Sequence, residues 1–194
     1  MNDGPSRPGG TVLLTGLPSS GKSTIAAATR QRVAAAGQRV EVLDGDDVRG
    51  RLWPELGLTP DDRSQNLGRI TALPLMLAGH GVLVLVLVAA IAPYSADRAL
   101  MRVRREDTGR YFAEVHVATA LSACAQRDVK GLCGRRSRGE LTQLTGVDAA
   151  YEEPPPHALR IDTTAESIAE SADHVLDLLI HRGLITSPLP SPRP

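Results

Sequence analysis

The sequence predicts an α/β fold in which helices cover both faces of a parallel sheet. Short apolar runs typical of buried strands alternate along the chain with segments of helical periodicity. The most apolar run, Gly81-VLVLVLVAAIA-Pro93, is much shorter than the roughly 20 residues of a membrane helix and shows no polar alternation, as expected for a central parallel strand. Strands are expected at 11–15, 38–43, 82–89, 111–117 and 158–161, and helices at 22–36, within 46–52 and 60–78, and at 95–106, 119–127 and 165–181.

The chain is expected to form one domain over residues 11–182, because 194 residues with 42% hydrophobic side chains suit a single globular core. The Gly- and Pro-rich residues 1–10 and the closing residues 183–194 are expected to be disordered. Between 130 and 156 the hydrophobic periodicity disappears while arginine and glycine accumulate. This predicts a lid or binding segment without regular structure, with a disordered insertion as the alternative.

Charge and cysteine content argue against several classes of function. The 22 basic and 22 acidic side chains cancel, so neither a nucleic-acid nor a membrane partner is indicated. Cys124 and Cys133 lack the spacing of metal or redox sites and are expected to be reduced thiols. Residues 1–10 have neither the basic nor the apolar part of a signal peptide, which predicts a cytoplasmic protein.

One segment carries a strong chemical signal. Gly16-LPSS-Gly21-Lys22-Ser23 fits G-x-x-x-x-G-K-[ST] between a predicted strand and a predicted helix, the context of a phosphate-binding P-loop in a P-loop NTPase-type fold. Lys22 is expected to reach the β- and γ-phosphates and Ser23 to ligate Mg²⁺. The alternative is a glycine-rich turn with a solvated lysine. The guanine-reading N-K-x-D of GTPases does not occur in the sequence. The predicted contacts of the nucleoside triphosphate in this loop are Gly16, Ser19, Ser20, Gly21, Lys22, Ser23 and Thr24.

Three aspartates follow the second predicted strand in Val40-EVLDGDDVR-Gly50, at the edge where parallel sheets bind ligands. A carboxylate there can hold Mg²⁺ through water or accept the proton of an attacking hydroxyl. Asp44 and Asp46 are the candidates for these roles. Capping of the next helix is the alternative for all three, and for Asp47 it is as good an interpretation.

These residues and several other motifs resemble the adenylylsulfate kinase family from about Thr11 to Leu179. The resemblance implies an ATP- and Mg²⁺-dependent kinase that transfers the γ-phosphate to the 3′-hydroxyl of adenylyl sulfate, and, by family habit alone, a homodimer. The motifs that carry it are GLPSSGKST, LDGDDVR, Asp62-RSQNLGRI, Ile91-APY with Ala96-Asp97-Arg98, Arg127-DVKGL, Leu144-TGVD, Tyr151-Glu152 and Ile161-Asp-Thr.

The resemblance also implies roles for single residues. Asp46 becomes the general base or a ligand of metal-bound water, Lys130 approaches the transferring phosphate, and Arg127 serves the adenine side of the ATP site. Lid arginines approach the phosphates as the lid closes, unless they form a solvated basic loop; these are Arg135, Arg136 and Arg138.

On the acceptor side, the resemblance assigns the phosphosulfate and ribose to Arg49, Arg63 and Asn66, since arginine offers a planar fork to anionic oxygens. Without the family, both arginines would be interpreted as solvated helix charges. The full predicted acceptor set is Asp44, Arg49, Leu58, Arg63, Asn66, Lys130 and Leu144.

The acceptor side also departs from the family, which stacks the acceptor's adenine between two phenylalanines. The matching residues here are Leu58 and Leu144, and the loss of two aromatic faces is expected to weaken base binding by about 2–4 kcal/mol. Trp53 could replace one face or pack a helix, while Phe112 is expected in a buried strand.

Two interpretations of the acceptor stay open. A divergent adenylylsulfate kinase is favoured by a small margin, because Asp46, Arg49, Arg63 and Asn66 persist. The alternative is a kinase for another small anionic or nucleotide-like hydroxyl compound. A nucleotide-binding switch or pseudo-kinase and a polynucleotide kinase are the rivals from other classes.

Overall fold

The computed structural model describes residues 9–79, 85–129, 131–139 and 144–186. Its five strands form one sheet in the order β2-β3-β1-β4-β5, with every neighbouring pair parallel. The strands are β1 (Gly10–Thr15), β2 (Val40–Asp44), β3 (Leu85–Ala89), β4 (Tyr111–Val117) and β5 (Leu159–Ile161). The predicted α/β fold with a parallel sheet is therefore confirmed.

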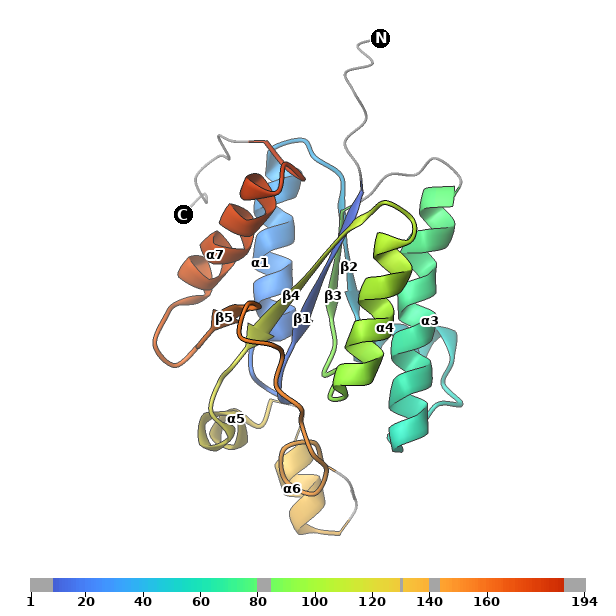
Figure 1. The fold of residues 1–194 in the computed structure, drawn as a ribbon. Coiled ribbons are helices and arrows are strands. Elements are labelled where there is room, and N and C mark those ends of the chain that lie inside the picture. Colours follow the sequence, from blue (N-terminus) through green and yellow to red (C-terminus); the bar gives the residue numbers. More distant parts are fainter. Residues whose placement is uncertain (1–8, 80–84, 130, 140–143, 187–194) are drawn as a thin grey trace.

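Helices cover both faces of this sheet (Figure 1). On one face lie α1 (Lys22–Ala35) and α7 (Ile168–His181), and on the other lie α3 (Pro60–Gly79) and α4 (Ser95–Glu106), with α2 (Gly45–Leu52) in contact with α3. Two short helices, α5 (Leu121–Arg127) and α6 (Leu132–Ser137), lie beyond the carboxyl ends of the strands (Figure 1).

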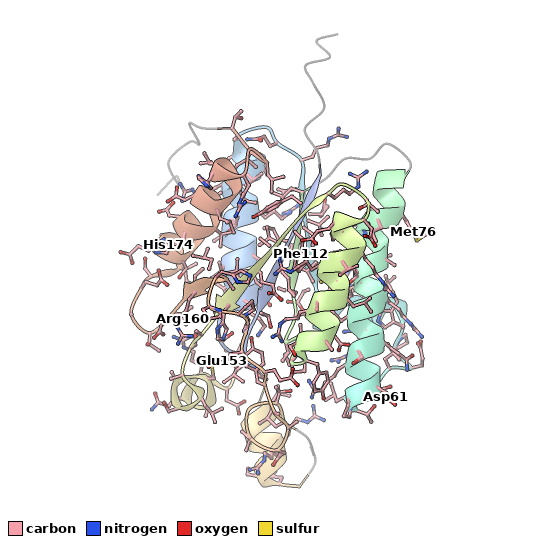
Figure 2. The ribbon with its side chains drawn as sticks, in the orientation of Figure 1. Asp61, Met76, Phe112, Glu153, Arg160 and His174 are labelled. Atoms are coloured by element: carbon pink, nitrogen blue, oxygen red, sulfur yellow. The ribbon has the colours of Figure 1, made fainter. Side chains whose placement is uncertain are left out.

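Each face of the sheet has its own hydrophobic core, which explains the unbroken apolar runs in the sequence. In β1, Val12 and Leu14 belong to the core under α1 and α7, whereas Leu13 belongs to the core under α3 and α4. All three side chains are fully buried, as in strands covered on both faces. Phe112 lies in the second core, in the buried strand where the sequence placed it (Figure 2).

Several element boundaries differ from the sequence-based expectation. The predicted helix from 165 begins at Ile168, because Ser167 caps it in a capping box with Glu170. The predicted disordered tail from 183 begins too early, since Leu184 and Ile185 are buried against the first core. Of the strand predicted at 82–89, residues 82–84 lie outside the described residues.

The segment 130–156 contains α6, so the expectation that it has no regular structure is wrong. This helix has six residues, fewer than two turns, and no hydrophobic periodicity can be read from so short a stretch. Within the described ranges, no helix combines the length and the hydrophobicity needed to cross a bilayer.

Candidate active site

The Gly16–Ser23 segment forms a tight loop between β1 and α1 that depends on unusual backbone angles. Gly16, Ser19 and Gly21 have positive φ values of 152°, 61° and 105°. A Cβ on Gly16 would lie 2.4 Å from the Val117 carbonyl oxygen, so no side chain fits there. The first turn of α1 contains no acidic residue and no side-chain cap, which leaves its N–H groups and positive dipole end to an anion.

Lys22 is buried in this loop with 8% of its surface exposed. Its ammonium group donates to the carbonyl oxygens of Gly16 at 3.0 Å and Leu17 at 2.6 Å. A buried ammonium must be satisfied by acceptors, and here the loop backbone supplies them. Lys22 is thus already placed where phosphate oxygens could replace the two carbonyl oxygens as partners of its ammonium group.

A second layer of hydroxyl groups supports the loop from beneath. The Ser20 carbonyl oxygen accepts from Thr119 Oγ1 at 2.9 Å and from Thr163 Oγ1 at 3.1 Å. Arg127 in turn donates to Thr163 Oγ1 at 2.7 Å and to its carbonyl oxygen at 2.9 Å. The residues after β4 and β5 therefore fix the P-loop, and Arg127 connects them to the wall of the cavity.

The three aspartates that follow Leu43 at the end of β2 have different hydrogen-bond and ion-pair partners. Asp44 caps α2, accepting from the Asp46 N–H at 3.0 Å, and also accepts the Ser23 hydroxyl. Asp46 is 2.7 Å from Arg49 Nη2, and Asp47 pairs with Arg51 at 2.8 Å away from the cavity. Asp44 is therefore the residue that caps α2, and it also lines the cavity. The capping alternative for Asp47 is wrong, because its side chain pairs with Arg51.

The residues predicted to bind the acceptor are held by short polar contacts among α2, α3 and the segment that joins them. Arg63 Nε donates to the Leu58 carbonyl oxygen at 2.9 Å. Asn66 is buried, donating to the Gly45 carbonyl oxygen at 3.2 Å and accepting from Trp53 Nε1 at 2.6 Å. Burial lowers the pKa of Arg63, a cost that nearby Asp46 partly offsets.

A cavity with a volume of about 430 Å³ joins these parts, a size typical of small-molecule sites. Gly16 and Ser20 do not line it but shape the loop beneath. Lys130 lies outside the described residues. The predicted residues that the structure brings together in its wall are Ser19, Gly21, Lys22, Ser23, Thr24, Asp44, Asp46, Arg49, Leu58, Arg63, Asn66, Arg127 and Leu144.

Neither the tryptophan nor the lid arginines are in the cavity wall. Trp53 is 8% exposed and packs in the core under α3, so of its two interpretations the helix-packing one fits. Arg136 is bound to Asp148 by hydrogen bonds of 2.6 to 2.9 Å. Leu58 and Leu144 do line the cavity, as aliphatic walls where the family has aromatic ones.

Sequence reasoning missed two groups of wall residues. The loop after β3 contributes Ala92, whose φ of 44° is rare for a residue with a side chain. Three further apolar residues in the wall are Val129, Leu132 and Ile168. The only available signal was position, because each of these residues lies after a strand or within a connection at the carboxyl edge of the sheet.

The residues also suit a magnesium ion. Ser23, Asp44 and Asp46 offer only oxygen donors, which Mg²⁺ prefers, and it commonly uses one or two carboxylates together with substrate phosphates. Among the described residues, no group of three or more His, Cys, Asp or Glu side chains forms a closed metal site. The donor set therefore fits an ion that binds together with a nucleotide.

A parallel α/β sheet with a P-loop and a carboxylate pair after the second strand defines a P-loop phosphotransferase. Residues 8–162 match the family model of adenylylsulphate kinase. The chain belongs to this family.

Individual relatives agree. An adenylyl-sulfate kinase from Picosynechococcus sp. is 40% identical over 178 residues, covering 92% of this chain and 97% of the relative. The solved Mycobacterium tuberculosis APS kinase CysC in complex with AMPPNP and APS is 40% identical, with a TM-score of 0.83 over 89% of this chain and 98% of that one. A hexameric APS kinase from Thiobacillus denitrificans is 31% identical, with a TM-score of 0.68 over 93% of this chain and 30% of that one.

Proposed function

We propose that this chain transfers the γ-phosphate of ATP to the 3′-hydroxyl of adenylyl sulfate, with the cavity between the P-loop and α2–α3 as its active site. The observation that carries the proposal is the placement of Lys22, Asp46 and Arg63 in one cavity wall, in a chain that belongs to the adenylylsulphate kinase family. A relative solved with AMPPNP and APS supports both substrates. A different acceptor gains no support from the relatives.

On the donor side, the P-loop N–H groups and the N-terminus of α1 bind the ATP phosphates, and Lys22 exchanges its loop carbonyl partners for phosphate oxygens. Arg127 and the apolar residues around it hold the nucleoside. Ser23 and Asp46 would hold Mg²⁺, whose role when bound is to neutralise charge on the phosphate oxygens. Lys130 adds positive charge near the transferring group.

On the acceptor side, Asp46 accepts the proton of the attacking hydroxyl, and Arg49 fixes the carboxylate by its 2.7 Å ion pair. Arg49, Arg63 and Asn66 orient the phosphosulfate and ribose, while Leu58 and Leu144 flank the base. The protein supplies mainly in-line placement and charge neutralisation, because phosphoryl transfer needs little covalent help. The homodimer and the cytoplasmic location stay predictions.

Acceptor-dependent release of ADP tests this function. The purified chain is given MgATP alone, with adenylyl sulfate, or with adenosine 5′-phosphate, which has the same nucleoside without the sulfate. We expect ADP release to depend on adenylyl sulfate. If saturating adenylyl sulfate adds nothing to the rate with ATP alone, the assignment is wrong.

The role of Asp46 is tested by Asp46→Asn, which keeps the size of the side chain but removes the basic oxygen. Loss of a general base typically lowers the rate by about 10²–10⁴-fold, so a drop in kcat of that order is expected. Asp177→Asn, on an exposed position of α7, is the matched control. A kcat of Asp46→Asn equal to that of the control would remove Asp46 from the chemistry.

A further inference from the structure

The turn at residues 144–149 places one wall of the cavity. The Leu144 carbonyl oxygen accepts from the N–H groups of Val147 at 3.0 Å and Asp148 at 2.9 Å, which closes the turn. Leu144 itself is 5% exposed and lines the cavity. The turn also packs on the P-loop, because a Cβ on Gly146 would lie 2.6 Å from Leu17 Cδ2 and the glycine has a φ of 88°. The position of the Leu144 wall therefore depends on how this turn is held.

A single carboxylate connects the 144–149 turn to α6. Arg136 Nε donates to both Asp148 oxygens, at 2.9 and 2.7 Å, and Arg136 Nη2 donates to Asp148 Oδ1 at 2.6 Å. Asp148 Oδ2 also accepts the backbone N–H of Leu144 at 3.2 Å. The Arg136 guanidinium holds the pKa of Asp148 below its ordinary value, so the pair stays charged at neutral pH.

The position of Arg136 in a basic segment suggests contact with the ATP phosphates, whereas this geometry indicates that it binds and orients Asp148. A guanidinium that forms a two-pronged contact with a carboxylate is oriented by it, and the contact is stronger than one between neutral groups. Nε and Nη2, the two nitrogens that form the fork of the guanidinium, are both directed at Asp148. Arg136 does not line the cavity, but Leu144 does. The two residues are connected through Asp148, which accepts hydrogen bonds from both.

We infer that Arg136 and Asp148 are positioning residues for the acceptor: together they hold the 144–149 turn so that Leu144 forms the wall against the acceptor's base. The inference rests on the proposed function, in which Leu144 flanks that base. Arg136 acts through Asp148 and not on the ATP phosphates. The two side chains therefore act as one unit, and removing either has the same consequence as removing both.

Steady-state kinetics of Arg136→Lys, Asp148→Asn and the double variant test this unit. We expect each single variant to raise the KM for adenylyl sulfate by about three- to fivefold, as for a partly exposed charged pair, and the double variant to show the same increase. The KM for ATP and kcat stay at the wild-type values. Arg32→Lys and Asp173→Asn, which disrupt an Arg–Asp pair between α1 and α7 away from the cavity, are the matched controls.

Hydrogen exchange on the same variants supplies a readout that does not need turnover. The Leu144 amide donates to Asp148, so faster exchange in a peptide covering 144–149 is expected in all three variants and in neither control. If Arg136→Lys alone raises the KM for ATP or lowers kcat while Asp148→Asn behaves as wild type, Arg136 acts on phosphate and the inference is wrong. It is equally wrong if exchange and acceptor KM match the controls. A wild-type chain without acceptor-dependent ADP release contradicts the proposed function instead, and exchange then decides whether the pair holds the turn.

Discussion

In the P-loop, the site residues are placed by the backbone and by buried hydroxyl groups, whereas on the proposed acceptor side Asp46 and Arg49 are placed by an ion pair between partly exposed side chains. Ser20 is fully buried and its carbonyl oxygen accepts from two threonines. The Asp46 side chain, by contrast, is 46% exposed and held by Arg49 from the next helical turn.

This difference predicts that the two halves tolerate substitution to different degrees. A backbone loop that needs glycine at position 16 tolerates little change, because any side chain there meets the Val117 carbonyl. A side chain such as Leu58, which lies in the connection between α2 and α3, can be exchanged without disturbing a strand of the sheet. Substitutions in the P-loop are therefore expected to disrupt the loop itself, whereas substitutions at Leu58 are expected to change the affinity for the acceptor.

Of the variants that test this difference between the two halves, Lys22→Met is expected to have the largest effect, because it keeps the buried stem and removes the ammonium group. Loss of a group that stabilises transition-state charge typically costs about 10²–10³ in kcat, and the same is expected here. Acceptor-dependent ADP release measures it, with the thermal midpoint reporting on the fold. Arg104→Met removes a charge from an exposed position of α4 and is the control. Similar rates for both variants would mean that the loop does not act on the transferred phosphate.

The difference between backbone placement and side-chain placement also determines which site residues can be predicted from the sequence. The P-loop was predictable because its backbone requirements fall on adjacent residues, so a short pattern records them. The aspartates after β2 were predictable from the edge of a parallel sheet, where ligands bind. Family resemblance, and not periodicity, singled out Arg49, Arg63 and Asn66, which the fold then brings into one wall.

Other features depend on contacts that join distant parts of the chain. Thr119 and Thr163 follow different strands and meet Ser20 only because β4 lies between β1 and β5. The partner of Arg136 lies twelve positions further on, and no local pattern connects it to Asp148. Trp53 could have stacked on a ligand or packed in the core, and only the packing of α2 on α3 distinguishes these.

An intermediate effect is expected when the aliphatic walls are made aromatic. If Leu58 and Leu144 flank the base, Leu58→Phe and Leu144→Phe each add a stacking face and lower the KM for adenylyl sulfate, by about three- to thirtyfold. Leu58→Phe is the safer variant, because Leu144 is more buried and a larger side chain there carries an overpacking cost of about 1–3 kcal/mol.

Initial rates at varied adenylyl sulfate and fixed ATP measure these KM values. Leu100→Phe, at a position of α4 that is 49% exposed, is the control for an added phenylalanine. An acceptor KM that stays at the wild-type value in a folded Leu58→Phe chain would show that the base binds elsewhere in the cavity.

The smallest effect is expected at His116, a buried residue of β4 that does not line the cavity. Burial lowers the pKa of His116 below its ordinary value of 6.5, and the ring contacts Tyr151, with centroids 5.7 Å apart, while Nδ1 lies 3.4 Å from Arg160 Nη1. Figure 2 shows Arg160 beside Glu153, whose charge opposes the shift. Between the lowered pKa and 6.5 the unfolded chain binds more protons, so this contribution to stability is complete above pH 6.5 and is lost as the pH falls.

His116→Asn keeps an acceptor for Arg160 but cannot be protonated in this range. The thermal midpoint of the wild type should therefore fall slightly between pH 7 and about pH 5, before most carboxylates titrate, and that of the variant should fall less. The exposed His157, changed to Asn, controls for the loss of a histidine elsewhere. His116 belongs to β4, the strand that pairs with β1 before the P-loop. Parallel curves for wild type and His116→Asn would mean that the buried imidazole is not what makes this part of the sheet sensitive to pH.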